Sequence, residues 1–262
     1  MNRKVKKLMS LKQRIETTEL AATELAVFWL GQAGFLIKDG KGRQVVIDPY
    51  LTDCGYRMKG FKRLSPKLIE PSELDVDYYI TTHLHFDHFD FDAIPEVAKN
   101  KKTKFYGPIS CFEQMKEMNI DDHRMTLLSE GVPISEKGIK IHPTFADHGE
   151  LAPDAVGVFL EIGKHKLYFS GDTAYKPEYF DSVATMKPDV AFLSVNGAFG
   201  NLNGEEGAKV ANQIGAKIAV PCHFWTFIEH GGDLKQFEHS MKLLSPNCQS
   251  YFMHQGECMV IK

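Results

Sequence analysis

The segment 81–90 constrains this chain most strongly, because it packs metal-binding types of side chain into a few positions. It reads TTHLHFDHFD and places His83, His85, Asp87 and His88 directly behind a β-rich run. Imidazoles at positions i and i+2 at a strand end point the same way, and the carboxylate and third imidazole on the next turn can converge with them. Without a cation, such crowding would cost desolvation and repulsion. We therefore predict a divalent-metal site where a strand gives way to a loop and a helix.

Three later segments end apolar strands with side chains that could complete this site. FADHGE contains His148, FSGDTAY contains Asp172 in a glycine-bearing turn, and VPCHFW contains His223. Each residue has a structural alternative when it is taken alone. Asp172 could cap a turn, His148 could lie in a solvated loop, and His223 could be a satisfied core histidine.

Strand and helix patterns alternate along the whole chain, which favours mixed sheets covered by helices. Two strands joined by a glycine-rich turn at KDGKGR are expected first, LAVFWLGQAGFLIKD and QVVIDPYL. Asn203 and Glu206 can form a capping box that opens a helix. The other expected strands lie in 77–83, 103–108, 138–149, 156–172, 189–197, 218–225 and 249–262. The expected helices, including the one with this capping box, lie in 91–102, 109–120, 201–216 and 233–244.

The composition is that of a globular protein with a substantial core, since 43% of the 262 residues are hydrophobic and 25% are charged. No repeat or linker divides it, so we expect a single domain over 1–262 with a leader helix within 1–20. A net charge of −3 without a long basic block gives no indication of a nucleic-acid partner.

Cysteine usage and hydropathy indicate where the protein works. The five cysteines are scattered, with no C-x-x-C pair. No apolar stretch has the length of a signal peptide or approaches the roughly 20 residues needed to cross a bilayer. We expect a cytoplasmic protein with a small-molecule substrate and no membrane partner. The sequence leaves the oligomeric state open, homo-oligomers included.

The cluster HLHFDH, followed in order by His148, Asp172 and His223, resembles the ligand signature of the metallo-β-lactamase superfamily. The resemblance implies a four-layer αββα sandwich with two metals at one edge. Asp48, in VVIDPYL, matches the early aspartate that supports such a site by fixing a ligand tautomer. By the same resemblance, one metal is held by His83, His85 and His148, the second by Asp87, His88 and His223, and Asp172 bridges them.

Other stretches resemble L-ascorbate-6-phosphate lactonases and related metal-dependent hydrolases. They are FWLGQAGFLIK, RMKGFKRLSPKLIEPSEL, SGDTAY and NQIGAKIAVPCHFW, and the match runs in patches from about residue 25 to the end. The chain lacks much of the N-terminal extension and C-terminal tail expected for those lactonases. The resemblance implies a lactonase-like carboxylic ester hydrolase that opens a lactone of a small anionic, sugar-like substrate, phosphorylated or not.

Hydrolysis at such a site needs no nucleophilic side chain. Two divalent ions that share a water lower its pKa, and hydroxide can then attack a carbonyl or phosphorus. Asp87 or Asp172 could pass a proton to the leaving oxygen, although both are also candidate ligands. Histidine and carboxylate ligands accept zinc, manganese or iron, and we expect zinc or manganese.

The segment YRMKGFKR gathers four basic side chains shortly before the cluster, Arg57, Lys59, Lys62 and Arg63. They could clamp a phosphorylated substrate, or they could form a solvated basic loop. Trp225 follows His223 closely and could wall a substrate pocket, or it could belong to the core.

Two other functions remain open on sequence grounds. The first is phosphodiester cleavage, including nuclease activity, which the same superfamily supports; the ordinary charge balance counts against it. The second is a non-catalytic metal-binding redox protein. The absence of a rubredoxin-like cysteine segment counts against that alternative.

Overall fold

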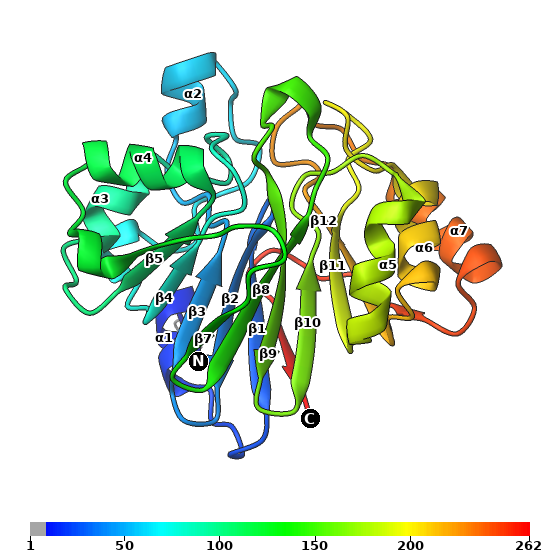
Figure 1. Ribbon diagram of the computed structural model, residues 1–262, viewed down its shortest axis with the longest axis horizontal. Helices are drawn as coiled ribbons and strands as arrows, with labels where there is room; N and C mark the ends of the chain where they lie inside the picture. Colours follow the sequence, from blue (N-terminus) through cyan, green and yellow to red (C-terminus); the bar gives the residue numbers. More distant parts are fainter. Residues whose placement is uncertain (1–8) are drawn as a thin grey trace, which may run out of the picture.

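Two seven-stranded sheets packed face to face form the centre of the protein in a computed structural model that describes residues 9–262 (Figure 1). Helices cover the outer face of each sheet. This arrangement gives the four layers of an αββα sandwich and confirms the predicted α/β fold class.

The first sheet is built from the N-terminal half of the chain and its last strand. Its strands are β1 (Leu25–Gly31), β2 (Gly34–Asp39), β3 (Gln44–Ile47), β4 (Tyr78–Ile80), β5 (Lys104–Gly107), β6 (Met125–Leu127) and β14 (Cys258–Ile261). In the order β14-β1-β2-β3-β4-β5-β6, the pairing is antiparallel up to β3 and parallel beyond it. The helices of this half are α1 (Leu11–Thr17), α2 (Cys54–Lys59), α3 (Ala93–Val97) and α4 (Ile109–Glu117).

The second sheet comes from the C-terminal half. Its strands are β7 (Ile134–Glu136), β8 (Ile139–Phe145), β9 (Val156–Ile162), β10 (His165–Phe169), β11 (Val190–Ser194), β12 (Ile218–Cys222) and β13 (Gln249–Ser250). They follow the order β13-β12-β11-β10-β9-β8-β7, parallel from β13 to β10 and antiparallel beyond. Its helices are α5 (Pro177–Met186), α6 (Gly204–Gln213) and α7 (Leu234–Leu244).

Strand β1 illustrates how the sequence specifies these layers. Val27 and Trp29 point into the core between the sheets, whereas Ala26, Phe28 and Leu30 join a second core under the helices of the first half. Alternate residues of a strand face opposite sides, so both faces of β1 are buried and its sequence reads as an almost continuous apolar run. Full burial of a side chain such as Phe28 contributes about 1.5–3 kcal/mol.

Polar residues follow several strands at one edge of the sandwich, the upper edge in Figure 1. Strand β3 leads to Asp48, and β4 leads into the histidine cluster. In the second sheet, β8 leads to His148, β10 to Asp172 and β12 to His223. The topology therefore directs the predicted ligands of both halves to the same edge.

The stretch 25–39 is a hairpin and not the single strand that its apolar run predicts. The chain reverses at Gly31 (φ 102°) and Gln32 (φ 53°), between β1 and β2. A Cβ on Gly34 would lie 3.1 Å from the carbonyl oxygen of Asp48, so glycine allows β2 to pass close to the end of β3. G-Q-A-G is thus a turn, although a run of buried residues surrounds it.

The predicted closing strand 249–262 is also wrong as a single element. It divides into β13, at the edge of the second sheet, and β14, at the edge of the first. A turn with Gly256 at φ 83° separates the two pieces. The sequence analysis also missed α2, which has only six residues, and α5, whose buried residues are Phe180 and Val183.

The helix ends agree better with the sequence. Asn203 caps α6 by accepting hydrogen bonds from the backbone of Glu205 and Glu206, and the Glu206 carboxylate accepts from Asn203 N at 2.9 Å. This confirms the predicted capping box. Helix α1 occupies part of the predicted leader, whose residues 1–8 lie outside the described part of the chain. Within residues 9–262, no helix is long and apolar enough to cross a membrane.

Candidate metal centre

A buried carboxylate holds the loop that carries the histidine cluster. Asp48 accepts hydrogen bonds from Thr82 N at 2.8 Å and from Thr82 Oγ1 at 2.6 Å, and its Oδ2 lies 2.8 Å from His88 Nδ1. The contact to Nδ1 turns Nε2 of His88 toward the centre. Asp48 itself has φ 45°, a strained conformation for a residue other than glycine.

His83, His85 and His148 form the first group of donors. Their candidate ligand atoms all lie within 4.8 Å of one another. His85 Nδ1 is 2.9 Å from His83 Nε2 and 3.3 Å from His148 Nε2. Burial lowers the pKa of all three imidazoles, that of His148 to about 4. The three rings are therefore neutral at pH 7, which is the form that binds metal.

Asp87, His88 and His223 form the second group, again within 4.8 Å. His223 Nε2 lies 3.2 Å from Asp87 Oδ2 and 3.0 Å from His88 Nε2. Burial acts to lower the pKa of His223, but Asp172 and Asp87 outweigh it and raise that pKa to about 9. Burial opposes ionisation of Asp87, yet the neighbouring histidines hold its pKa well below the usual range. Without a cation, imidazolium protons balance the carboxylates.

Asp172 lies between the two groups. Its Oδ1 is 3.2 Å from His88 Nε2, and its Oδ2 is 3.2 Å from His223 Nε2 and 3.8 Å from His148 Nε2. Asn201 donates to the same Oδ2 at 2.7 Å and so fixes the carboxylate. The Asp172 carboxylate thus lies close to ring nitrogens of both groups of candidate ligands.

The donor set fits a divalent cation. Asp172 Oδ1 is buried and makes no hydrogen bond to another described residue, although a buried carboxylate oxygen normally has a partner. In the first group, neutral imidazoles also turn ring nitrogens toward one another. A cation would satisfy the lone pairs on both sides. Imidazole and carboxylate donors together suit zinc, manganese or iron.

The centre opens into a cavity of about 410 Å³. Phe61, Phe86 and Phe199 line it, and the Phe61 ring centroid lies 5.4 Å from that of Phe86 and 6.3 Å from that of Phe199. A Cβ on Gly55 would lie 2.5 Å from the Phe86 ring, so glycine makes room for that ring. The full lining is Lys59, Phe61, His85, Phe86, Asp87, His148, Leu151, Asp172, Phe199, His223 and His230.

The guanidinium of Arg63, one of the predicted substrate residues, is already engaged away from this cavity. It donates to the carbonyl oxygens of Tyr50 at 2.9 Å and Thr52 at 2.8 Å, and it lies over the Tyr50 ring. Its side chain is 6% exposed. These contacts tie the segment down and leave Arg63 little capacity to bind a substrate.

The structure does not bring Arg57, Lys62 or Trp225 to the cavity either. Arg57 is exposed and pairs with Asp92 at 2.5 Å, and Lys62 is exposed. Trp225 is 56% exposed and lines a neighbouring hollow, where its Nε1 donates to Gly232 O at 3.0 Å. Lys59, from the same basic segment, does line the cavity.

Four residues close to the centre escaped the sequence analysis. Gln32 and His230 contact Asp87, Asn201 contacts Asp172, and Asp90 holds the loop after the cluster by accepting from several backbone N–H groups. Gln32 was hidden in a supposed strand interior. His230 and Asn201 lie beside glycine-rich turns, in HGGD and FGNLNG. These turns were the sequence feature that could have indicated the two residues.

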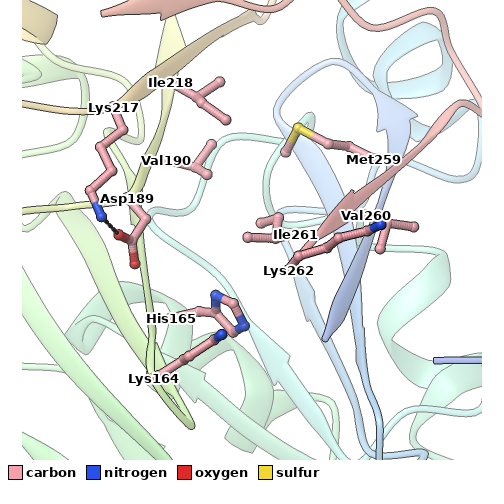
Figure 2. Close-up of a pocket in the computed structure, with 10 residues that line it drawn as sticks. All are labelled: Lys164, His165, Asp189, Val190, Lys217, Ile218, Met259, Val260, Ile261 and Lys262. Carbon is pink, nitrogen blue, oxygen red and sulfur yellow. Dashed lines mark hydrogen bonds and ion pairs between the residues drawn. The ribbon is translucent and has the colours of Figure 1, made fainter. Parts of the chain in front are cut away.

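A second cavity, of about 480 Å³, lies at the opposite edge of the sandwich, where β10, β11 and β12 begin and β14 ends (Figure 2). Three of its polar side chains already have partners. Lys217 pairs with Asp189 at 2.7 Å, and His165 Nε2 lies 2.6 Å from the carbonyl oxygen of Thr23. At the histidine cluster, by contrast, buried side-chain atoms of Gln32, His148, Asp172, Asn201 and His223 make no hydrogen bond among the described residues.

Comparison with known proteins places the chain among metal-dependent hydrolases. The Beta-lactamase superfamily domain matches residues 43–224. A UPF0173 metal-dependent hydrolase of Polynucleobacter asymbioticus is 26% identical over 255 residues, which cover 90% of this chain and 85% of the relative. A probable L-ascorbate-6-phosphate lactonase, UlaG, of Salmonella heidelberg is 25% identical and covers 81% of this chain and 73% of its own length.

Solved structures show the same fold. Igni18, a metallo hydrolase from the archaeon Ignicoccus hospitalis, superposes with a TM-score of 0.73 at 20% identity, over 92% of this chain and 99% of that one. The isothiocyanate hydrolase from Delia radicum gut bacteria gives 0.67 at 20% identity, over 89% and 98%. The matched domain covers more than half of the chain and includes the whole histidine cluster. This chain belongs to the metallo-β-lactamase superfamily and is one of its metal-dependent hydrolases.

Proposed function

We propose that the protein hydrolyses a small carboxylic ester, in the first place a lactone, with an apolar body and no more than one anionic group. One observation carries this proposal: the buried histidine and aspartate cluster opens into a cavity lined by Phe61, Phe86 and Phe199, and among the described residues of its lining Lys59 is the only lysine or arginine. Such a lining favours an apolar ring and disfavours a polyanion.

In this proposal two divalent ions occupy the centre, and zinc or manganese is expected, with iron also compatible. When bound, such ions activate water and polarise the oxygen under attack. His83, His85 and His148 would hold the first ion. Asp87, His88 and His223 would hold the second ion, and Asp172 would lie between the two.

The chain's own residues orient the substrate and handle protons. Phe61, Phe86 and Phe199 form an aromatic wall of the cavity. This aromatic wall packs against the body of the substrate and excludes water from that side. Asp87 Oδ2 and Asp172 Oδ2 are the candidates to take up the proton of the attacking water and return it to the leaving oxygen. Asp172 is fixed by Asn201, so its carboxylate keeps one orientation during that transfer.

The likeness to the probable L-ascorbate-6-phosphate lactonase supports lactone opening as the reaction. It supports a phosphorylated substrate less well, because Arg57, Lys62 and Arg63 do not line the cavity. Lys59 can meet a single carboxylate or phosphate at the mouth, as a point charge on a flexible stem.

A turnover screen with manganese or zinc restored tests the proposal. The substrates are an aryl lactone (dihydrocoumarin), a sugar lactone (glucono-δ-lactone), a phosphorylated sugar lactone and the phosphodiester bis(p-nitrophenyl) phosphate. We expect the highest kcat/KM for the aryl lactone. Faster cleavage of the phosphodiester than of every lactone would overturn the proposal in favour of a phosphodiesterase.

A further inference from the structure

Gln32 makes contacts to the metal centre that the family's ligand pattern does not include. It lies in the β1–β2 turn and is fully buried. Its Nε2 is 2.7 Å from Asp87 Oδ2, 2.7 Å from His230 Nδ1 and 3.1 Å from His223 Nε2. Its carbonyl oxygen accepts from His223 N at 3.0 Å. One residue therefore contacts two of the candidate ligands, one of them through both its side chain and its backbone.

The backbone of Gln32 is held in an unfavourable conformation. Its φ of 53° is left-handed, which is uncommon for a residue with a side chain and persists only where surrounding contacts impose it. Here the Trp29 indole, which donates to the Gln32 carbonyl at 3.0 Å, and the bond from His223 impose it. The turn is thereby tied to the loop after β12.

The side-chain amide forms a link between Asp87 and His230. Its nitrogen carries two hydrogens, and the two shortest contacts, both 2.7 Å, account for both of them. The His230 ring stacks on the His223 ring with a centroid distance of 4.8 Å and an interplanar angle of 7°. Gln32 and His230 together therefore restrain both the carboxylate of Asp87 and the ring plane of His223.

This restraint acts on one side of the centre only. Among the described residues, the polar contacts of the Gln32 side chain are with Asp87, His223 and His230. None reaches His83, His85 or His148. The side of the centre made by Asp87, His88 and His223 is thus supported by a turn that does not touch the other side.

We propose that Gln32, acting with His230, is a positioning residue that sets Asp87 and His223 for the metal on their side of the centre. The inference rests on the proposed two-metal function. Groups that orient metal ligands typically contribute about 10–100-fold to metal affinity. Loss of the Gln32 amide should therefore weaken one of two metal-binding steps and spare the other.

Calorimetric titration of the metal-free protein with Mn²⁺ tests this. The variant Gln32→Met keeps the length of the side chain and removes its donor. The matched control is Gln255→Met, because the Gln255 amide donates to Leu30 O and Pro66 O and lies against Gly31, beside the same turn, without touching the ligands. We expect Gln32→Met to weaken one step about 10–100-fold and the other less than about twofold, whereas Gln255→Met leaves both unchanged.

A second variant, His230→Leu, keeps the test decisive if Gln32→Met does not fold. It should weaken the same step, since it removes the other end of the link. Unchanged metal affinity at both steps would overturn the proposal. Equal weakening of both steps would also overturn it and would show that the turn serves stability only. The titration measures metal binding alone, so it gives its answer even if no ester is hydrolysed.

Discussion

The metal centre and the basic segment 57–63 were both candidate functional regions in the sequence, the first strongly constrained by its residues and the second not, and the structure treats them differently. At the centre, side chains from separate strand ends converge, and Asp172 Oδ1 is left without a hydrogen bond among the described residues. In the basic segment, Arg57 pairs with Asp92, and Arg63 is bound to backbone oxygens. The centre therefore gathers several candidate ligands in one small space, whereas the guanidinium groups of Arg57 and Arg63 are already paired.

The largest effect is expected for Asp172→Ala, which removes the carboxylate between both groups. Turnover should fall by roughly 10³-fold, as for loss of a group that acts both on the metals and in proton transfer. The control is Asp189→Ala, at the remote cavity, which should keep wild-type turnover. Wild-type activity in Asp172→Ala would show that Asp172 does not bridge the two metal positions.

Asp48→Asn should have the next largest effect. Asp48 orients His88 through Nδ1, and loss of such support typically weakens metal binding about 10–100-fold. Metal titration followed by turnover at saturating metal separates affinity from chemistry. We expect weaker binding with turnover largely restored at high metal concentration. Unaltered affinity would show that the loop holds His88 without Asp48.

Phe199→Ala tests the aromatic wall. Phe199 lines the cavity and is 48% exposed, so its truncation should leave the fold intact. Loss of its apolar contact should raise KM for an aryl lactone by about tenfold and leave KM for a small aliphatic ester nearly unchanged. Phe252→Ala, which removes another partly exposed ring outside this cavity, is the matched control. Equal changes in KM for both substrates would show that Phe199 does not bind the aryl group of the substrate.

The smallest effects on activity are expected in the basic segment itself. Arg63→Ala should lower the free energy of unfolding by about 2 kcal/mol, because it removes charge-assisted hydrogen bonds from a largely buried group. Lys62→Ala, at an exposed site, should change it by less than about 0.5 kcal/mol. Denaturant unfolding measures both. A selective rise in KM for phosphorylated substrates in either variant would show that the basic segment binds the phosphate group, as the sequence suggested, and would contradict this account.

The same contrast shows what could be predicted from the sequence. The cluster His83, His85, Asp87 and His88 indicates a metal because a cation offsets the desolvation and repulsion that such crowding costs. Apolar runs of strand length with helices between them predicted mixed sheets covered by helices, whereas the four-layer order was implied by the family resemblance. Charge runs carry no such constraint, so the positions of Arg57 and Arg63 depended on partners that only the folded chain supplies.

Backbone geometry accounts for most of what was missed. Gln32 lies within an apolar run whose left-handed turn is not marked by the usual Asn-Gly or Asp-Gly pair. His230 contacts the centre because the loop after β12 folds back over His223, which local sequence patterns do not reveal. Similarly, the segment 249–262 reads as one strand, because its two short strands join sheets whose arrangement is set by the rest of the chain.

The metal content of the purified protein tests the central claim most directly. Elemental analysis of wild type, His148→Ala and His223→Ala after equilibration with manganese or zinc would count the ions held by each side. We predict close to two ions per chain in wild type and close to one in each variant, since each loses a donor from a different group. A wild-type chain that retains no divalent metal would contradict the account and leave the histidine cluster without its proposed role.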